Sequence, residues 1–190
     1  MRLKDENKSE RIFEASIQLI NEFGLAQTSM SKIAKKANVS SSTIYVYFEN
    51  KEDMLNKLYL NVKKKMSRAV FDSFDDSASL QTAFETGLRK YAHFILNNKD
   101  YFLFMEQFSN SPLIHNVSRK EGTDLFAPFH NLLEKGKKQN VFKQVDKNLL
   151  IIFTFDPVSN FVKQYFNGLS ELNEDNLNKI IQMSWDAIKA

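Results

Sequence analysis

A run of hydroxyl-bearing side chains, followed by two tyrosines and a lysine, carries the most readable chemistry in this chain. Its members are Ser40, Ser41, Ser42, Thr43, Tyr45, Tyr47 and Lys51. Hydroxyl groups donate hydrogen bonds to phosphates or to base edges, and the Thr43 methyl group can pack on a thymine methyl. Lys51 lies at the predicted start of a helix, where its ammonium group can hold a phosphate. The run therefore indicates contact with double-stranded DNA.

Two short helices joined by a tight turn would position these side chains. Thr28 or Ser29 can cap the first helix through its hydroxyl, and Asn38 tolerates the left-handed backbone of the turn. Ser40 caps the second helix. The N–H groups at both helix starts, around Thr28, Ser29 and Ser40, offer further phosphate contacts. Packing one helix across another is the simplest device for placing side chains in a major groove.

Apolar residues between these positions would form the small core that fixes the angle between the two helices. They are Ile33, Ala34, Ala37, Val39, Ile44 and Phe48. Upstream, the spacing predicts a helix over Glu10 to Phe23 with Gly24 as its cap. Downstream, Asn50 and Asp53 form a capping box for a helix that runs past Met66. Spacing alone leaves an ordinary helical hairpin with exposed serines and tyrosines as an equal alternative.

The same stretch resembles the DNA-binding motif of the tetracycline-repressor (TetR) family at seven matched elements. They are Phe23-Gly24, Thr28-Ser29, Ile33-Ala34, Val39-Ser40, Ile44-Tyr45, Tyr47-Phe48 and Asn50-Lys51-Glu52. Two positions depart from the pattern, because Asn38 and Ser42 stand where many members have glycine. Ser42 can add a hydrogen bond or hold the backbone away from phosphate. The resemblance is close over residues 10 to 66 and weaker afterwards.

Composition places the chain among all-α proteins. Its 190 residues include only 5 Gly and 3 Pro, so the chemistry of β-turns is scarce. Residues 1–65 hold 12 basic and 8 acidic residues, a net +4, although the whole chain carries only +3. There is no cysteine. Neither a signal peptide nor a membrane span is expected, so we predict a cytoplasmic protein without a cofactor.

The resemblance implies two domains. Residues 1–55 would form a three-helix DNA-binding domain with a helix-turn-helix. Residues 56–190 would form a helical ligand-binding and dimerisation domain. The fourth helix, which reaches to about residue 70, would connect the two. Beyond residue 67 the pattern predicts amphipathic helices at Leu80 to Leu96, Tyr101 to Phe108, about Arg119 to Lys138, Asp146 to Phe166 and Glu174 to Ile188.

An excess of Phe in the second domain suggests an apolar pocket. The candidates are Tyr91, Phe94, Met105, Phe108, Phe126, Phe129, Phe153 and Asp156. The alternative is ordinary core for the apolar side chains, and helix capping or solvent exposure for Asp156. The resemblance also implies a dimer interface built from the last two helices. Its candidates are Phe161, Tyr165, Leu177, Ile181, Ser184, Trp185 and Ile188, for which the core of a single chain is again the alternative.

The expected function is a homodimeric transcriptional regulator, a repressor released from a palindromic DNA operator by a small lipophilic effector. The alternative is a DNA-binding protein of the same fold that a protein partner switches. No phosphate-binding glycine loop, nucleophile elbow or histidine pair supports an enzyme. His93, His115 and His130 lack the spacing of metal ligands, so no metal site is expected.

Overall fold

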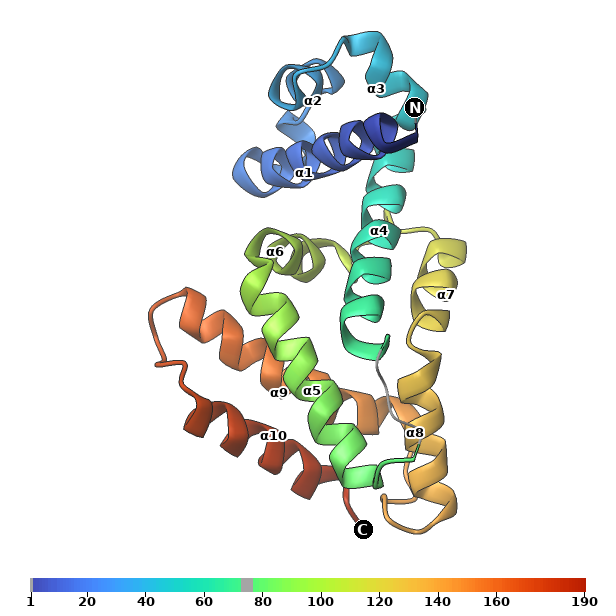
Figure 1. The fold of residues 1–190 in the computed structure, drawn as a ribbon, viewed down its shortest axis with the longest axis vertical. Helices are drawn as coiled ribbons and strands as arrows, with labels where there is room; N and C mark the ends of the chain where they lie inside the picture. The colour runs from blue at the N-terminus through green and yellow to red at the C-terminus, as the bar shows by residue number, and fades with distance from the viewer. Residues whose placement is uncertain (1, 73–76) are drawn as a thin grey trace. The chain divides into compact units, whose positions relative to one another are not determined.

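The computed structural model describes residues 2–72 and 77–190, and the named secondary-structure elements in these ranges are ten helices (Figure 1). They are α1 (Arg2–Gln27), α2 (Met30–Ala37), α3 (Ser41–Tyr47), α4 (Lys51–Phe71), α5 (Leu80–Asn97), α6 (Lys99–Phe108), α7 (Asn116–Asp124), α8 (Ala127–Lys138), α9 (Lys147–Phe166) and α10 (Glu174–Ile188). This confirms the all-α class. None of the described helices combines the length and apolar character that crossing a membrane requires.

The chain forms two compact units, and the first is discontinuous in sequence. It joins the chain up to Lys63 with Asn98–Gly122, and the second joins Lys64–Asn97 with Thr123–Ala190. This division differs from the boundary expected near residue 55. The reason is that α6 packs against α1, where the Asn21 side chain donates to the Asp100 carbonyl at 2.8 Å.

One apolar core holds the first unit together. Phe48, at the end of α3, is fully buried and lies against Phe13 of α1 with ring centroids 5.4 Å apart. Phe104 and Phe108 of α6 belong to the same core. Burying such aromatic side chains contributes roughly 1.5–3 kcal/mol each, so this core fixes the helices that carry the candidate DNA contacts.

An interruption of the helix separates α7 from α8, where the periodicity predicted one helix from about Arg119 to Lys138. That prediction was wrong. Phe126 leaves helical geometry at φ −100° and ψ 15°, and Pro128 lies in the first turn of α8. Proline lacks an N–H and fixes φ, so it favours a helix start over a helix interior.

Aromatic rings form the core of the second unit. Phe84 of α5 lies 5.4 Å from Trp185 of α10, and Phe142 lies 5.3 Å from the same ring, both edge-on. The end of the chain is tied to this core through its backbone, because Ala190 donates to the Val141 carbonyl at 2.9 Å. The aromatic ring of Phe142 is fully buried.

Gly136, inside α8, lets the Phe142 ring approach the helix backbone. A Cβ atom at this position would lie 2.1 Å from the nearest ring carbon. Gly136→Ala should gain up to about 1 kcal/mol of helix propensity but lose more by overpacking, because the buried ring cannot move aside. We expect a net loss of about 2 kcal/mol in the free energy of unfolding, measured by chemical denaturation.

Phe142→Leu provides the matched test of this steric account. Leucine is smaller and flexible, so Gly136→Ala should cost clearly less in the Phe142→Leu background than in the natural chain. If the effects of the two substitutions on the free energy of unfolding are strictly additive, the contact between residue 136 and the Phe142 ring is not the cause of the lost stability.

Candidate nucleic-acid interface

The turn between α2 and α3 has the capping geometry expected of a helix-turn-helix. The Ser29 hydroxyl accepts a hydrogen bond from the Lys32 N–H at 3.2 Å, which caps α2. Asn38 adopts the left-handed conformation at φ 55°, and the next N–H, of Val39, donates to the Ala34 carbonyl at 2.9 Å. These local interactions confirm the predicted cap and turn.

A cluster of three hydroxyl groups opens α3. Ser40 Oγ accepts from the Thr43 N–H at 3.3 Å and lies 2.9 Å from Ser42 Oγ and 2.7 Å from Thr43 Oγ1. The hydroxyl groups thus hold one another in place at the helix start. An ordered hydroxyl cluster loses less conformational freedom when it binds a phosphate or a base edge.

The two faces of α3 differ sharply in exposure. Ile44 is fully buried, as is Phe48 just beyond the helix. Ser41, Ser42 and Tyr45 are exposed, as is Val46, whose exposed fraction of 81% is very high for an aliphatic side chain. The buried face anchors α3 to the core, and the exposed face is free to enter a groove.

Three of the predicted DNA-contact residues make packing contacts or hydrogen bonds within the first unit. Thr28 is buried, and its hydroxyl donates to the Gly24 carbonyl at 2.9 Å, where the backbone leaves helical geometry at φ 77°. Tyr47 is half-buried against the core. The Lys51 ammonium donates to the carbonyls of Leu25 and Ala26 at 3.2 and 3.0 Å.

The predicted cap at the start of α4 is present as a variant of the capping box, in which the return hydrogen bond comes from Glu49 instead of Asn50. Asn50 Oδ1 accepts from the Asp53 N–H at 2.9 Å, while Asp53 Oδ2 accepts from the Glu49 N–H at 2.9 Å. Lys57 Nζ lies 2.8 Å from the same carboxylate and also donates to the Tyr47 carbonyl at the end of α3. Burial would raise the pKa of Asp53, but the hydrogen bonds from Lys57 and Glu49 and the Lys57 charge together lower it.

Sequence reasoning missed Val46 and the exposed lysines of α2. Val46 follows Ser42 by four residues, so helical spacing alone places it on the same face. Lys35 and Lys36 lie exposed in the last turn of α2. They add positive charge on the element next to α3, and such charge favours contact with a phosphate backbone.

Five of the eight predicted pocket residues lie in three separate places. Met105 and Phe108 belong to the core of the first unit. Phe94 is buried in α5 of the second unit. Phe153 and Asp156 are exposed on the outer face of α9.

Phe155, which the sequence analysis did not single out, gathers the remaining candidates. Its ring centroid lies 5.0 Å from that of Tyr91, 4.7 Å from Phe129 and 6.2 Å from Phe126. The Tyr91 hydroxyl lies 2.7 Å from Ser159 Oγ, one turn beyond Phe155 on α9. The structure thus brings Tyr91, Phe126 and Phe129 together around one face of α9.

The predicted interface residues of α10 lie inside the single chain. Leu177, Ile181, Ser184, Trp185 and Ile188 are all buried without a second copy. For these five residues the structure favours the core alternative over a dimer interface. On α9, Phe161 is half-buried and Tyr165 is exposed.

Two family models match the chain. Residues 12–58 match "Bacterial regulatory proteins, tetR family", and residues 79–189 match "Tetracyclin repressor-like, C-terminal domain". The chain is 24% identical to an "Uncharacterized HTH-type transcriptional regulator" of Haemophilus influenzae, and the alignment covers 100% of both chains.

Solved structures extend this likeness to the fold. A TetR family transcription regulator from Marinobacter aquaeolei matches with a TM-score of 0.94 at 27% identity, covering 100% of this chain and 99% of that one. The regulator FadR from Bacillus subtilis, in complex with stearoyl-CoA, matches in fold with a TM-score of 0.75 at 20% identity, covering 95% of this chain and 99% of that one. The chain therefore belongs to the tetR family of bacterial regulatory proteins, and it is a DNA-binding transcriptional regulator rather than an enzyme.

Proposed function

We propose that this regulator is a homodimeric repressor that a small lipophilic molecule releases from a palindromic operator. The observation that supports it best is that α9 has two apolar faces. One face is buried in the chain and includes Leu150, Val158 and Val162. The other is exposed and carries Leu149, Ile152 and Phe153.

The exposed face has the spacing of an interface stripe. Leu149, Ile152 and Phe153 fall three and four residues apart, and Phe153 has an exposed fraction of 51%. On α10, Met183 is also exposed. Contiguous apolar surface of this kind is typical of surfaces that bind another protein. A second copy is the natural occupant, because two-fold proteins meet two-fold DNA sites.

The aromatic cluster around Phe155 is the site where we propose that the effector binds. It is apolar apart from the paired hydroxyl groups of Tyr91 and Ser159. A mostly apolar lining with a few polar groups suits a lipophilic ligand with one polar end. The fold shared with the stearoyl-CoA complex supports an acyl compound as its class.

Release would follow from the spacing of the two recognition helices. In a dimer they must meet successive major grooves about 34 Å apart. A ligand that binds more tightly to an arrangement with a different helix spacing lowers operator affinity. The size of the effect is the difference between the ligand's binding free energies for the two arrangements. Opening of the packed second unit to admit the ligand would couple ligand binding to the change in spacing between the two recognition helices.

The test is a fluorescence-anisotropy titration with DNA flanking the regulator's own gene, repeated at several salt concentrations. Long-chain acyl-CoA, free coenzyme A, the free fatty acid and a lipophilic cation are then added separately. We expect salt-sensitive binding that the acyl compounds abolish and free coenzyme A does not. Tight binding that no compound relieves would contradict effector release and favour a regulator switched by a protein partner.

Val46 should contribute directly to operator affinity. Val46→Ala removes two methyl groups from the exposed face of α3, and burying apolar groups of this size against a thymine methyl contributes about 1 kcal/mol or more. We expect roughly tenfold weaker operator binding with unchanged thermal stability, measured by the same anisotropy assay.

Val117→Ala on α7 is the matched control. Val117 is exposed to nearly the same extent, 79% against 81%, and belongs to the same unit. It lies outside the helix-turn-helix, so its truncation should leave operator affinity unchanged. Equal effects of the two substitutions on operator affinity would show that Val46 does not belong to the DNA-binding surface.

A further inference from the structure

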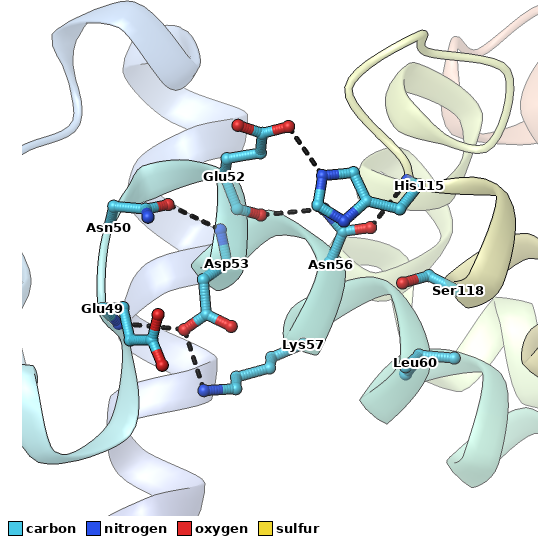
Figure 2. Close-up of a pocket in the computed structure, with 9 residues that line it drawn as sticks. All are labelled: Glu49, Asn50, Glu52, Asp53, Asn56, Lys57, Leu60, His115 and Ser118. Carbon is cyan, nitrogen blue, oxygen red and sulfur yellow. Dashed lines mark hydrogen bonds and ion pairs between the residues drawn. The ribbon is translucent and has the colours of Figure 1, made fainter.

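Lys57 connects the first turns of α4 to the end of α3. Its ammonium group donates to the Tyr47 carbonyl at 2.9 Å and to Asp53 Oδ2 at 2.8 Å. Asp53 Oδ2 also accepts from the Glu49 N–H at 2.9 Å, and Figure 2 shows Lys57 and Glu49 on the same carboxylate. The backbone is therefore held on both sides of Phe48, through the Tyr47 carbonyl and the Glu49 N–H.

The short helix α3 needs such support from outside. It has only seven residues, Ser41–Tyr47, and isolated helices below about 12 residues are marginal in water. Ile44 is its one buried residue, and the buried Phe48 follows the helix directly. Contacts from other elements must therefore set the angle at which α3 presents its exposed face.

The end of α3 offers carbonyl groups and a partial negative charge. The last four carbonyls of an α-helix lie beyond its own hydrogen-bond ladder, and the helix dipole favours a cation near them. The Phe48 N–H donates to the first of these carbonyls, that of Ile44, at 3.0 Å. α3 contains no lysine or arginine of its own. Lys57 thus supplies from the next helix a cation and a donor for the Tyr47 carbonyl.

The bond to Tyr47 distinguishes Lys57 from an ordinary lysine on a helix surface. Lys179 of α10 forms the same kind of pair with a carboxylate four residues earlier, that of Asp175 in the first turn. The Lys179 pair lies within one helix, whereas Lys57 also reaches the end of another. Exposed pairs contribute little by themselves, so any larger effect of Lys57 reports its bond to Tyr47.

We propose that Lys57 is a positioning residue for DNA recognition, which holds the end of α3 so that the exposed face of this helix meets base edges in one orientation. This role rests on the proposed function, in which α3 enters a major groove. Lys57 acts through Tyr47 and not as a phosphate contact, because two of its three donor positions are taken by Tyr47 and Asp53.

The test compares Lys57→Met with Lys179→Met, because methionine keeps a long side chain but has neither the charge nor the donors. Fluorescence anisotropy gives the affinity for the operator and for a scrambled duplex of the same length, over a series of salt concentrations. For Lys57→Met we expect about tenfold weaker operator binding, with unchanged affinity for the scrambled duplex. The slope of log affinity against log salt concentration should also stay unchanged. Lys179→Met should match the natural chain in all three quantities.

Hydrogen–deuterium exchange of the free protein measures the effect on α3 without DNA. Peptides that cover α3 should exchange several-fold faster in Lys57→Met than in the natural chain, because the end of the helix opens more often. Exchange in α1 should stay unchanged, since its contact with Phe48 does not involve Lys57. Thermal melting verifies that each variant is folded.

Three results would overturn the proposal. The first is exchange in α3 that Lys57→Met leaves unchanged, and the second is an operator affinity equal to that of Lys179→Met. The third is an equal loss of affinity for both duplexes with a smaller salt slope, which would make Lys57 a phosphate contact. Val46→Ala tests separately whether α3 enters the groove, so failure of that placement is distinguishable from failure of Lys57 to hold the helix.

Discussion

Trp185→Ala should lower the free energy of unfolding by about 3–5 kcal/mol, the usual cost of removing a large aromatic side chain from a core. The Trp185 ring is buried within one chain and lies edge-on to Phe84 and Phe142. Its loss leaves a cavity, and neither Phe84 nor Phe142 can move into this cavity without losing its contact with the other ring. The quantity to measure is the denaturant-unfolding free energy of a monomeric variant, since dimerisation would add its own stability.

Met183→Ala is the control for Trp185→Ala on the same helix. Met183 is exposed, so its truncation in the monomeric variant should change stability by less than about 0.5 kcal/mol. If Trp185→Ala left the monomer stable and only abolished dimerisation, Trp185 would belong to the interface and the packing described for α10 would be wrong.

Phe153→Glu should convert the protein to a folded monomer. Phe153 is the last residue of the exposed apolar stripe of α9, and in the proposed dimer a carboxylate there would be buried without a partner. Light scattering should give the mass of one chain at micromolar concentration. Operator affinity should fall more than about 100-fold, because each half-site is then bound independently.

The control for Phe153→Glu introduces the same charge elsewhere. Val117→Glu, on the exposed surface of α7, should leave the protein dimeric. Circular dichroism must give the same helix content for both variants. A dimer that persists in Phe153→Glu would place the interface on a different surface, and the proposed role of α9 would fail.

Local signals predicted the helix-turn-helix well. Asn38 adopts the left-handed backbone, Ser40 caps α3, and Asn50 and Asp53 cap α4, all as the sequence indicates. Each of these features depends on one side chain and the backbone within a few residues. Sequence reasoning is strong where the cause is local in this way.

The sequence could not decide which of several apolar faces points inward. On α10 we predicted that the periodic stripe through Trp185 forms the dimer interface, with the core as the alternative, and the structure places it in the core of one chain. On α9, Phe153 and Phe155 are both aromatic, yet only Phe155 joins Tyr91 and Phe129. The choice depends on where distant helices pack, and periodicity carries no information about that.

The discontinuous first unit has a consequence for synthesis. Phe104 and Phe108 of α6 complete the core that also contains Ile12 and Phe48. A ribosome that adds about 5–20 residues per second makes the stretch between Lys63 and Phe104 in roughly two to eight seconds. During that interval the nascent DNA-binding helices lack part of their apolar cover, and a fragment that stops at residue 63 never receives it.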